Sequence, residues 1–313
     1  EITGSRGVVF ATGTPVSNSM TELYTIQRYL QYERLQELNM THFDCWASRF
    51  GETVTALELA PEGTGYRART RFSKFFNLPE LMNLFKEVAD IKTADQLDLP
   101  TPEVEYHNIV AKPTGHQQDM VKALSERAAK VHSGTVDPST DNMLKITSDG
   151  RKLGLDQRII NPMLPDEPGT KVNQCVDNIL QIWRDGQPEK LTQLVFCDIS
   201  TPQAAGSKKV AKTLDNPILH ALEQAVPEPE KPLAFTVYED IRQKLIAQGM
   251  PASQIAFIHE ANTEVRKKEL FSKVRSGQVR VLLGSTQKMG AGTNVQDLLV
   301  ALHDLDCPWR PGD

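Results

Sequence analysis

Two turns rich in glycine and threonine are the parts of this sequence best suited to bind phosphate. The first turn is Thr12-Gly13-Thr14-Pro15, and the second turn, residues 285–294, contains Ser285, Thr286, Gly290, Gly292, Thr293 and Asn294. Glycine has no side chain, so backbone N–H groups can approach an anion closely, and the hydroxyl groups add further hydrogen-bond donors. Either turn alone could be an ordinary turn. Two of them, about 270 residues apart and each closing a strand of a separate lobe, are a much more specific signal.

Each turn directly follows a run of residues typical of a buried strand. Val8, Val9 and Phe10 precede the first turn, and residues 279–284 (VRVLLG) precede the second. Ligands of parallel sheets collect beyond the carboxyl ends of the strands, which is where these turns would lie. Further strands are predicted at residues 191–197, 255–258 and 298–302, with amphipathic helices between them that stop at Gly249 and Gly277. This alternation predicts an α/β fold with parallel strands and helices on both faces of the sheet.

The sequence predicts two lobes. The stretch LDLPTPE, with Pro100 and Pro102, disfavours helix on both sides and predicts a hinge. Residues 1–104 would form the first lobe, with helices from Ser19 and Thr41, Trp46 on an apolar helical stripe, and an exposed excursion between Glu52 and Arg71. Residues 105–313 would form the second lobe. It would have a helical lead-in at 105–170, a sheet core at 171–313, and a proline-rich insertion at about 200–232 with one short helix at 218–225.

Composition sets limits on function. The 313 residues, 39% hydrophobic and 24% charged, suffice for two domains and exclude a peptide hormone or a disordered tail. With 35 basic and 40 acidic residues the net charge is -5, so a nucleic acid would have to meet a local basic patch. The four cysteines form no CxxC pair, which fits a reducing cytoplasm. No apolar run approaches the roughly 20 residues that cross a bilayer, so no membrane partner is expected.

The chain resembles superfamily-two helicase-like ATPases of the Swi/Snf type. It is most similar to the helicase portion of bacterial, phage and plasmid proteins that join such an ATPase to a DNA methylase. Residues 11–24 (ATGTPVSNSMTELY) resemble the family's third motif, residues 282–296 (LLGSTQKMGAGTNVQ) the fifth, and residues 304–311 (DLDCPWRP) the lead-in to the sixth. The segment at the family's lobe junction resembles residues 99–110 (LPTPEVEYHNIV). A helix end of the family resembles residues 155–162 (LDQRIINP), and its fourth motif resembles residues 194–198 (LVFCD). The sequence differs from the chromatin-remodelling branch of this family at Gln287, Met289 and Arg310. These differences favour the methylase-linked branch.

This resemblance implies a fold and a set of site residues. The fold would consist of two RecA-like lobes with parallel sheets, the first only partly present. The first turn would couple the nucleotide cleft to DNA through Thr12, Gly13, Thr14 and Pro15. The second turn would touch the DNA backbone through Ser285 and Thr286. The ATP cleft would be lined by Gly290, Gly292, Thr293 and Asn294. Such hydroxyl and amide contacts hold phosphates without reading the base sequence.

Three parts of the family's machinery do not occur in the sequence. It has no G-x-x-x-x-G-K-[ST] loop, no acidic motif for magnesium, and no arginine-bearing sixth motif. The chain is therefore expected to be a fragment of a longer ATP- and magnesium-dependent DNA helicase or translocase. Its partners would be DNA and the missing portions of the parent chain, and it should not hydrolyse ATP alone. The alternative is a non-catalytic nucleic-acid or protein interaction module that keeps the helicase fold.

Overall fold

The structure is a computed structural model that describes residues 7–16, 19, 21–60, 66–97, 102–202, 235–290 and 293–308. The chain divides into two compact units. Unit 1 comprises Glu1–Asn108 with Trp309–Asp313, and unit 2 comprises Ile109–Pro308. Each unit has its own hydrophobic core, so each is considered separately.

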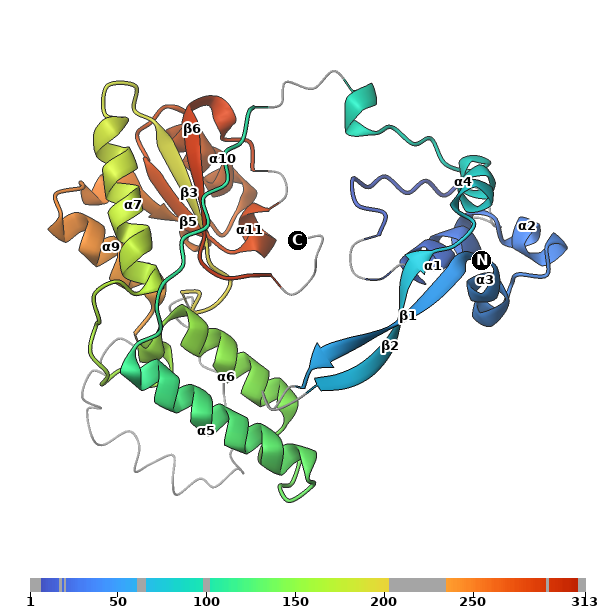
Figure 1. The fold of residues 1–313 in the computed structure, drawn as a ribbon. Coiled ribbons are helices and arrows are strands. Elements are labelled where there is room, and N and C mark those ends of the chain that lie inside the picture. The colour runs from blue at the N-terminus through green and yellow to red at the C-terminus, as the bar shows by residue number, and fades with distance from the viewer. Residues whose placement is uncertain are drawn as a thin grey trace, which may run out of the picture. The chain divides into compact units, whose positions relative to one another are not determined.

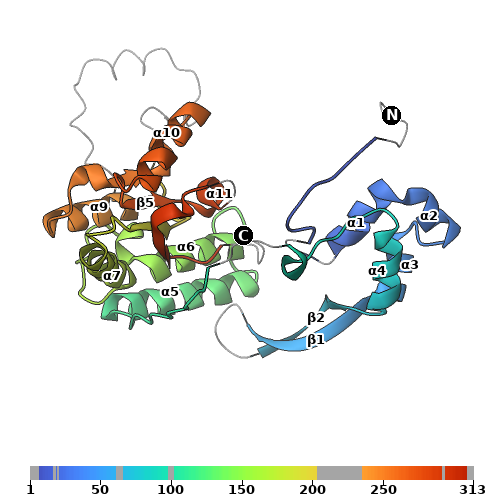
Figure 2. The same cartoon turned by 90° about the horizontal axis from the view of Figure 1, so that it is seen from above.

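Unit 1 combines short helices with one β-hairpin (Figures 1 and 2). Its described elements are α1 (Thr21–Leu30), α2 (Tyr32–Glu37), α3 (Phe43–Phe50), β1 (Gly51–Leu59), β2 (Tyr66–Phe75), α4 (Leu78–Lys86) and the 3₁₀ turn η1 (Ala94–Gln96). The helices predicted from the apolar stripes after Ser19 and Thr41 are confirmed as α1 and α3. Both present their buried side chains on one face, as amphipathic helices do.

The core of unit 1 is built around Trp46. This side chain is fully buried, and its ring lies 5.5 Å from Tyr24 and 5.7 Å from Phe50, measured between ring centroids. Its indole Nε1 donates a 2.7 Å hydrogen bond to Oε1 of Gln27, which is itself buried. The prediction that Trp46 packs in a core is therefore confirmed, and the polar edge of the indole has a partner.

Two sequence predictions for unit 1 need correction. Val8, Val9 and Phe10 form no strand, and Val9 is 87% exposed. A strand needs a neighbour to bond its backbone, and the described strands of unit 1, β1 and β2, pair with each other. The excursion predicted between Glu52 and Arg71 is largely this hairpin. Its strands are antiparallel because a short connection joins them, whereas parallel neighbours need a long crossover. Within the described part of unit 1, the parallel sheet expected for a first lobe is thus not seen.

Unit 2 contains a four-stranded parallel sheet (Figure 1). Its strands are β3 (Thr192–Phe196), β4 (Ile255–Phe257), β5 (Val281–Gly284) and β6 (Leu299–Asp304), in the spatial order β4-β5-β3-β6. All three strand pairs are parallel. The four strands predicted for this part of the chain, and their parallel arrangement, are confirmed.

Helices cover both faces of this sheet. The described helices of unit 2 are α5 (Gly115–His132), α6 (Met143–Leu155), α7 (Lys171–Asp185), α9 (Val237–Ala247), α10 (Glu264–Arg275) and α11 (Thr286–Met289), with 3₁₀ turns at Gln157–Ile159, Ala252–Gln254, Ile258–Glu260 and Gln296–Leu298. On one face, Val195 and Leu283 pack with residues of α7 and α9. On the other face, Leu194 and Leu282 pack with Val274 of α10. This alternation of neighbouring strand residues between two cores confirms the predicted α/β layering.

The helical lead-in to the sheet is an α5–α6 pair whose ends are fixed by polar side chains. Thr114 and Gln117 form a capping box at the start of α5. Arg127 of α5 makes a two-pronged ion pair with Asp141 at 2.7 and 2.9 Å, and its third nitrogen contacts Asp149 of α6 at 3.0 Å. Figure 1 shows the two helices side by side.

Two further predictions fall outside this description. The short helix at residues 218–225 and the last three residues of the DLDCPWRP segment, 309–311, lie outside the described residues. Within the described ranges, no helix combines the length and apolar character that a membrane span requires.

Candidate functional site

The carboxyl edge of the sheet in unit 2 brings together three loops that are distant in sequence. Asp198 follows β3, Ser285 and Thr286 follow β5, and Asp306 follows β6. Because these strands are parallel neighbours, their carboxyl ends meet at one edge. This is the edge at which the sequence predicted the second turn.

Two carboxylates tie these loops together. Asp306 accepts hydrogen bonds from the backbone N–H of Asp198 at 2.8 Å and of Ile199 at 2.7 Å. Asp198 in turn accepts the backbone N–H of Thr286 at 2.7 Å. Burial raises the pKa of the Asp306 carboxyl above its ordinary value, although the two N–H donors act in the opposite direction. The edge is therefore a connected polar network of the β3, β5 and β6 loops.

Ser285 and Thr286, the predicted DNA-backbone residues, are engaged with the protein in this conformation. Ser285 is only 8% exposed, and the N–H of Thr286 is occupied by Asp198. Just before them, Gly284 is held in close contact: a Cβ atom there would lie 2.5 Å from Ile258 Cγ2 and 2.6 Å from Met289 Sδ. Glycine at this point lets the short helix α11 lie against the end of β5. The predicted DNA contact of both residues stays a prediction.

The predicted ATP-cleft residues lie after α11. Gly290 caps this helix, and a Cβ atom there would come within 2.6 Å of the Thr286 carbonyl oxygen. The Thr293 hydroxyl is buried and has no hydrogen-bond partner among the described residues, whereas the Asn294 carbonyl accepts a 2.7 Å bond from Arg275. Gly292 lies outside the described residues. A buried hydroxyl without a hydrogen-bond partner is rare. Among the predicted ATP-cleft residues, the Thr293 hydroxyl is therefore the group that could take a ligand as its missing partner.

The first turn belongs to unit 1 and is open to solvent. The Thr14 backbone N–H is bonded to the Thr12 hydroxyl at 3.0 Å, a local turn of the kind threonine favours. A Cβ atom on Gly13 would meet nothing within 4 Å. Residues 12–15 are all exposed, so their polar groups are accessible. Whether the first and second turns share one cleft stays a prediction.

Two histidines near the sheet are held neutral. His303 on β6 donates from Nε2 to Oε1 of the buried Gln193 at 2.8 Å, and burial lowers its pKa to about 4. His259, after β4, packs edge-on against Tyr238. Burial and the nearby Lys288 lower its pKa to about 4 as well. Both histidines favour the uncharged form in the folded protein.

Acid is therefore expected to destabilise unit 2 through His303. Its folded pKa of about 4 lies below the ordinary 6.5, so between these values the unfolded chain takes up a proton that the folded chain does not. The stabilisation is complete above pH 6.5 and is lost as the pH falls toward 4, amounting to about 2 kcal/mol by pH 5. Urea unfolding at pH 7 and pH 5 should show a smaller pH effect for His303→Asn than for the wild type. The exposed His116→Asn variant serves as the control, and an unchanged pH effect in His303→Asn would contradict the assignment.

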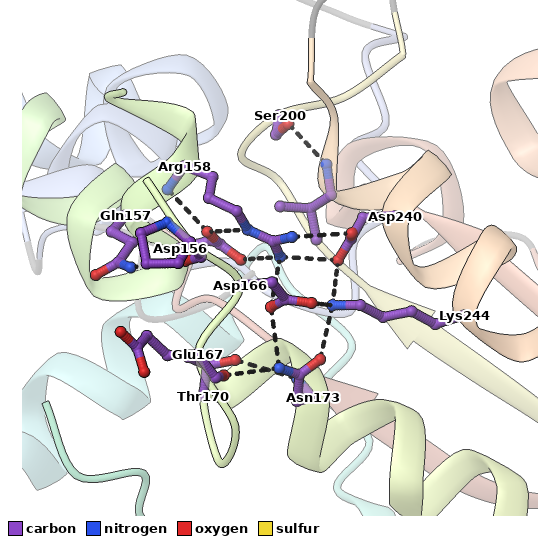
Figure 3. A network of polar contacts seen from close by, with 12 residues as sticks. Asp156, Gln157, Arg158, Asp166, Glu167, Thr170, Asn173, Ser200, Asp240 and Lys244 are labelled. Carbon is purple, nitrogen blue, oxygen red and sulfur yellow. Dashed lines mark hydrogen bonds and ion pairs between the residues drawn. The ribbon is translucent and has the colours of Figure 1, made fainter. Parts of the chain in front are cut away.

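A second polar network of unit 2 is formed by ion pairs and hydrogen bonds around Arg158 (Figure 3). Arg158 contacts Asp156 at 2.7 Å and Asp240 of α9 at 2.9 Å, and Lys244 contacts Asp240 and Asp166 at 2.7 Å each. The network joins the LDQRIINP segment to α7 and α9. The sequence singled out that segment as a motif but did not predict the ion pair between Arg158 and Asp240, because these two residues are 82 positions apart.

Two cavities among the described residues do not coincide with the predicted site. One of 350 Å³ is lined by polar residues of α7 that include Asp177 and Arg184, and one of 370 Å³ lies between α5 and α6 beside Arg127. Both are open to solvent, unlike the clefts that usually enclose small ligands. The carboxyl edge of the sheet therefore remains the candidate site on the strength of its loops.

Comparison with known proteins identifies a helicase-like segment. Residues 3–93 match a family described as a probable helicase domain. This match includes the first turn and the β-hairpin and lies entirely within unit 1. No curated protein matches the chain. The helicase-like part of the sequence-based resemblance is supported, while its Swi/Snf type and its link to a methylase stay predictions.

Proposed function

We propose that this helicase-like chain is part of an ATP-dependent DNA translocase or helicase that couples ATP hydrolysis to movement on DNA. The observation that carries the proposal is the helicase-domain match over residues 3–93, which contains the first turn. Independent support comes from unit 2, where the second turn follows β5 at the carboxyl edge of a parallel sheet. Ligands of such sheets bind at this edge.

The two turns would have different tasks in this proposal. Residues 12–15 are exposed and would relay the state of the nucleotide to DNA. The unpartnered Thr293 hydroxyl, with Gly290 and Asn294 beside it, would face the nucleotide. For Ser285 and Thr286 to reach a DNA phosphate, the Thr286 N–H would have to exchange its bond to Asp198 for one to the phosphate. Such contacts are independent of base sequence.

Magnesium does not fit the residues described here. Among the described residues, no group of three or more histidine, cysteine, aspartate or glutamate side chains could hold a metal ion. The sequence also contains no G-x-x-x-x-G-K-[ST] loop for the ATP phosphates. In this proposal, magnesium and the triphosphate would therefore be held by residues other than those that the structure describes. Location of the protein in the cytoplasm likewise stays a prediction.

The missing loop favours one alternative, a non-catalytic interaction module that keeps the helicase fold. The coding sequence on both sides of residues 1–313 distinguishes the two. A lysine-bearing phosphate loop and an acidic strand-end motif on one side, with an arginine-bearing motif on the other, would support the translocase. A gene that encodes none of these would support the module instead.

The translocase proposal also predicts a mutational effect. In the gene product that includes the phosphate loop, Thr12→Val with Thr14→Val should lower DNA-stimulated ATP hydrolysis about 100-fold, because small misplacements of positioning groups cost that much. Nucleotide binding, measured without DNA, should change little. The exposed pair Thr135→Val with Thr140→Val provides the control. Full DNA-stimulated hydrolysis in the Thr12/Thr14 variant would contradict the role of the first turn.

A further inference from the structure

The β1–β2 hairpin of unit 1 carries a row of arginines on one face. Arg67, Arg69 and Arg71 occupy alternate positions of β2, and alternate residues of a strand point to the same side. All three are exposed. The residues opposite them on β1 are Glu58, Ala56 and Val54.

The positive charge of this row is largely uncompensated. Glu58 is the acidic residue on this face of β1. It lies opposite Arg67 in the strand register, but its carboxylate bonds Arg71 at 2.7 Å. Arg67 and Arg69 form no hydrogen bond or ion pair with any residue that the structure describes. The fold therefore gains nothing visible from these two guanidinium groups. They stand out in a chain whose net charge is -5.

The hairpin that carries this row is anchored in the hydrophobic core of unit 1. At its base, Phe72 and Phe75 pack against Trp46 in the core of unit 1. On the face opposite the arginines, the Thr55 and Thr70 hydroxyls are bonded at 2.7 Å. Toward the far end, Leu57 and Tyr66 are each 74% exposed. Figures 1 and 2 show the two strands extending beyond the helices of unit 1.

We propose that the arginine face of this hairpin binds the sugar–phosphate backbone of duplex DNA. Guanidinium groups bond phosphates through two parallel N–H groups, which makes arginine the side chain suited to this contact. From Arg67 to Arg71 the row spans about 14 Å. Over that axial length one DNA strand carries about four phosphates. A two-stranded β-ribbon also fits the width of the major groove, so the hairpin can follow the duplex without clashing with it.

This contact goes beyond the proposed function. It lies outside both glycine- and threonine-rich turns, belongs to unit 1 alone, and needs no nucleotide. It is the local basic patch that an acidic chain would need for a nucleic-acid partner. Because phosphates are the same along every duplex, the binding is independent of base sequence.

Salt dependence of DNA binding tests the proposal. Affinity of the 313-residue chain for a labelled random-sequence duplex is measured by fluorescence anisotropy between 50 and 200 mM salt. Each lost phosphate contact lowers the slope of log affinity against log salt by about 0.9, so Arg67→Gln with Arg69→Gln should lower it by about 1.8. Across this fourfold range of salt the wild type should then lose about 12-fold more affinity than the variant.

Three further variants and probes make the result specific. Lys122→Gln with Lys130→Gln removes the same charge from the exposed side of α5 and should leave the slope at the wild-type value. Arg67→Lys with Arg69→Lys keeps the charge and should keep the slope. An unchanged slope in the glutamine variant, or an equal loss in the α5 control, would overturn the proposal. So would a polyglutamate peptide that displaces the duplex as well as unlabelled DNA does, since that would indicate an acidic protein partner. None of these readouts involves ATP, so failure of the translocase proposal would leave them unaffected.

Discussion

Replacing Arg158 with methionine will lower the free energy of unfolding of unit 2 by about 3–5 kcal/mol, the usual cost of removing one partner of a buried ion pair. The guanidinium group bonds both oxygens of Asp156, whose side chain is 2% exposed, and both oxygens of Asp240. Without it, two largely buried carboxylates lose their main counter-charge. Lys244 would still neutralise Asp240 but forms no hydrogen bond or ion pair with Asp156 among the described residues.

The charge state of Arg158 supports this expectation. Burial alone would lower its pKa, but the Asp156 and Asp240 carboxylates outweigh burial and raise the pKa above its ordinary value. The side chain is therefore charged at every pH at which the protein is folded. Its guanidinium group also lies over the Phe235 ring, 4.5 Å from the centroid, and this packing is lost in the variant.

Urea unfolding followed by circular dichroism measures the effect. The control is Lys267→Met on α10, whose pair with Glu264 is solvent-exposed and should contribute less than about 0.5 kcal/mol. A triple variant, Arg158→Met with Asp156→Asn and Asp240→Asn, removes the buried charges together and should recover part of the loss. An Arg158→Met protein as stable as the wild type would show that the network does not hold unit 2 together.

Replacing Trp46 with alanine will lower the free energy of unfolding of unit 1 by about 3–5 kcal/mol, as large-to-small substitutions in a packed core do. The indole is fully buried and contacts aromatic rings from α1, α3 and β2. Its removal also leaves Oε1 of the buried Gln27 without a donor, which adds to the cost. The base of the hairpin loses its main support at the same time.

Because the chain has two units, its unfolding is expected to occur in two steps, and the Trp46 variant should shift only one of them. Trp46→Phe keeps an aromatic ring and loses only the indole N–H, so it should cost less. Tyr29→Ala removes an aromatic ring that is mostly exposed and should change stability by less than about 1 kcal/mol. Equal effects of the Trp46 and Tyr29 variants would refute the central role of Trp46.

Prediction from sequence was accurate where the signal is local. The strands and helices of the sheet in unit 2 follow from apolar periodicity, and the helix stops at Gly249 and Gly277 agree with their positive φ angles of 96° and 70°. The burial of Trp46 was predicted from the apolar helical stripe on which it lies. Cys45 has the same apolar neighbours but is exposed, because its place on α3 turns it away from the stripe that contains Trp46 and Phe50.

Prediction was weakest where two distant segments must meet. Val8, Val9 and Phe10 have the composition of a strand, yet the described part of unit 1 places no strand beside them. The hairpin was missed because glycine, threonine and charged residues predominate between Glu52 and Arg71, a composition that favours an exposed loop. The links between Asp306, Asp198 and Thr286 join residues roughly 90 to 110 positions apart, and no local pattern marks them.

The sequence by itself determined the α/β class of the sheet region, the identity of the two candidate phosphate-binding turns and the resemblance to helicases. These depend on periodicity and on residue types that lie close together in the chain. Only the tertiary structure decided that Asp198 occupies the Thr286 N–H, that Arg158 neutralises two buried carboxylates, and that the arginines of β2 are exposed and largely unpaired. The physical reason is that hydrogen bonds and ion pairs depend on distance in space, which chain folding sets and sequence separation does not.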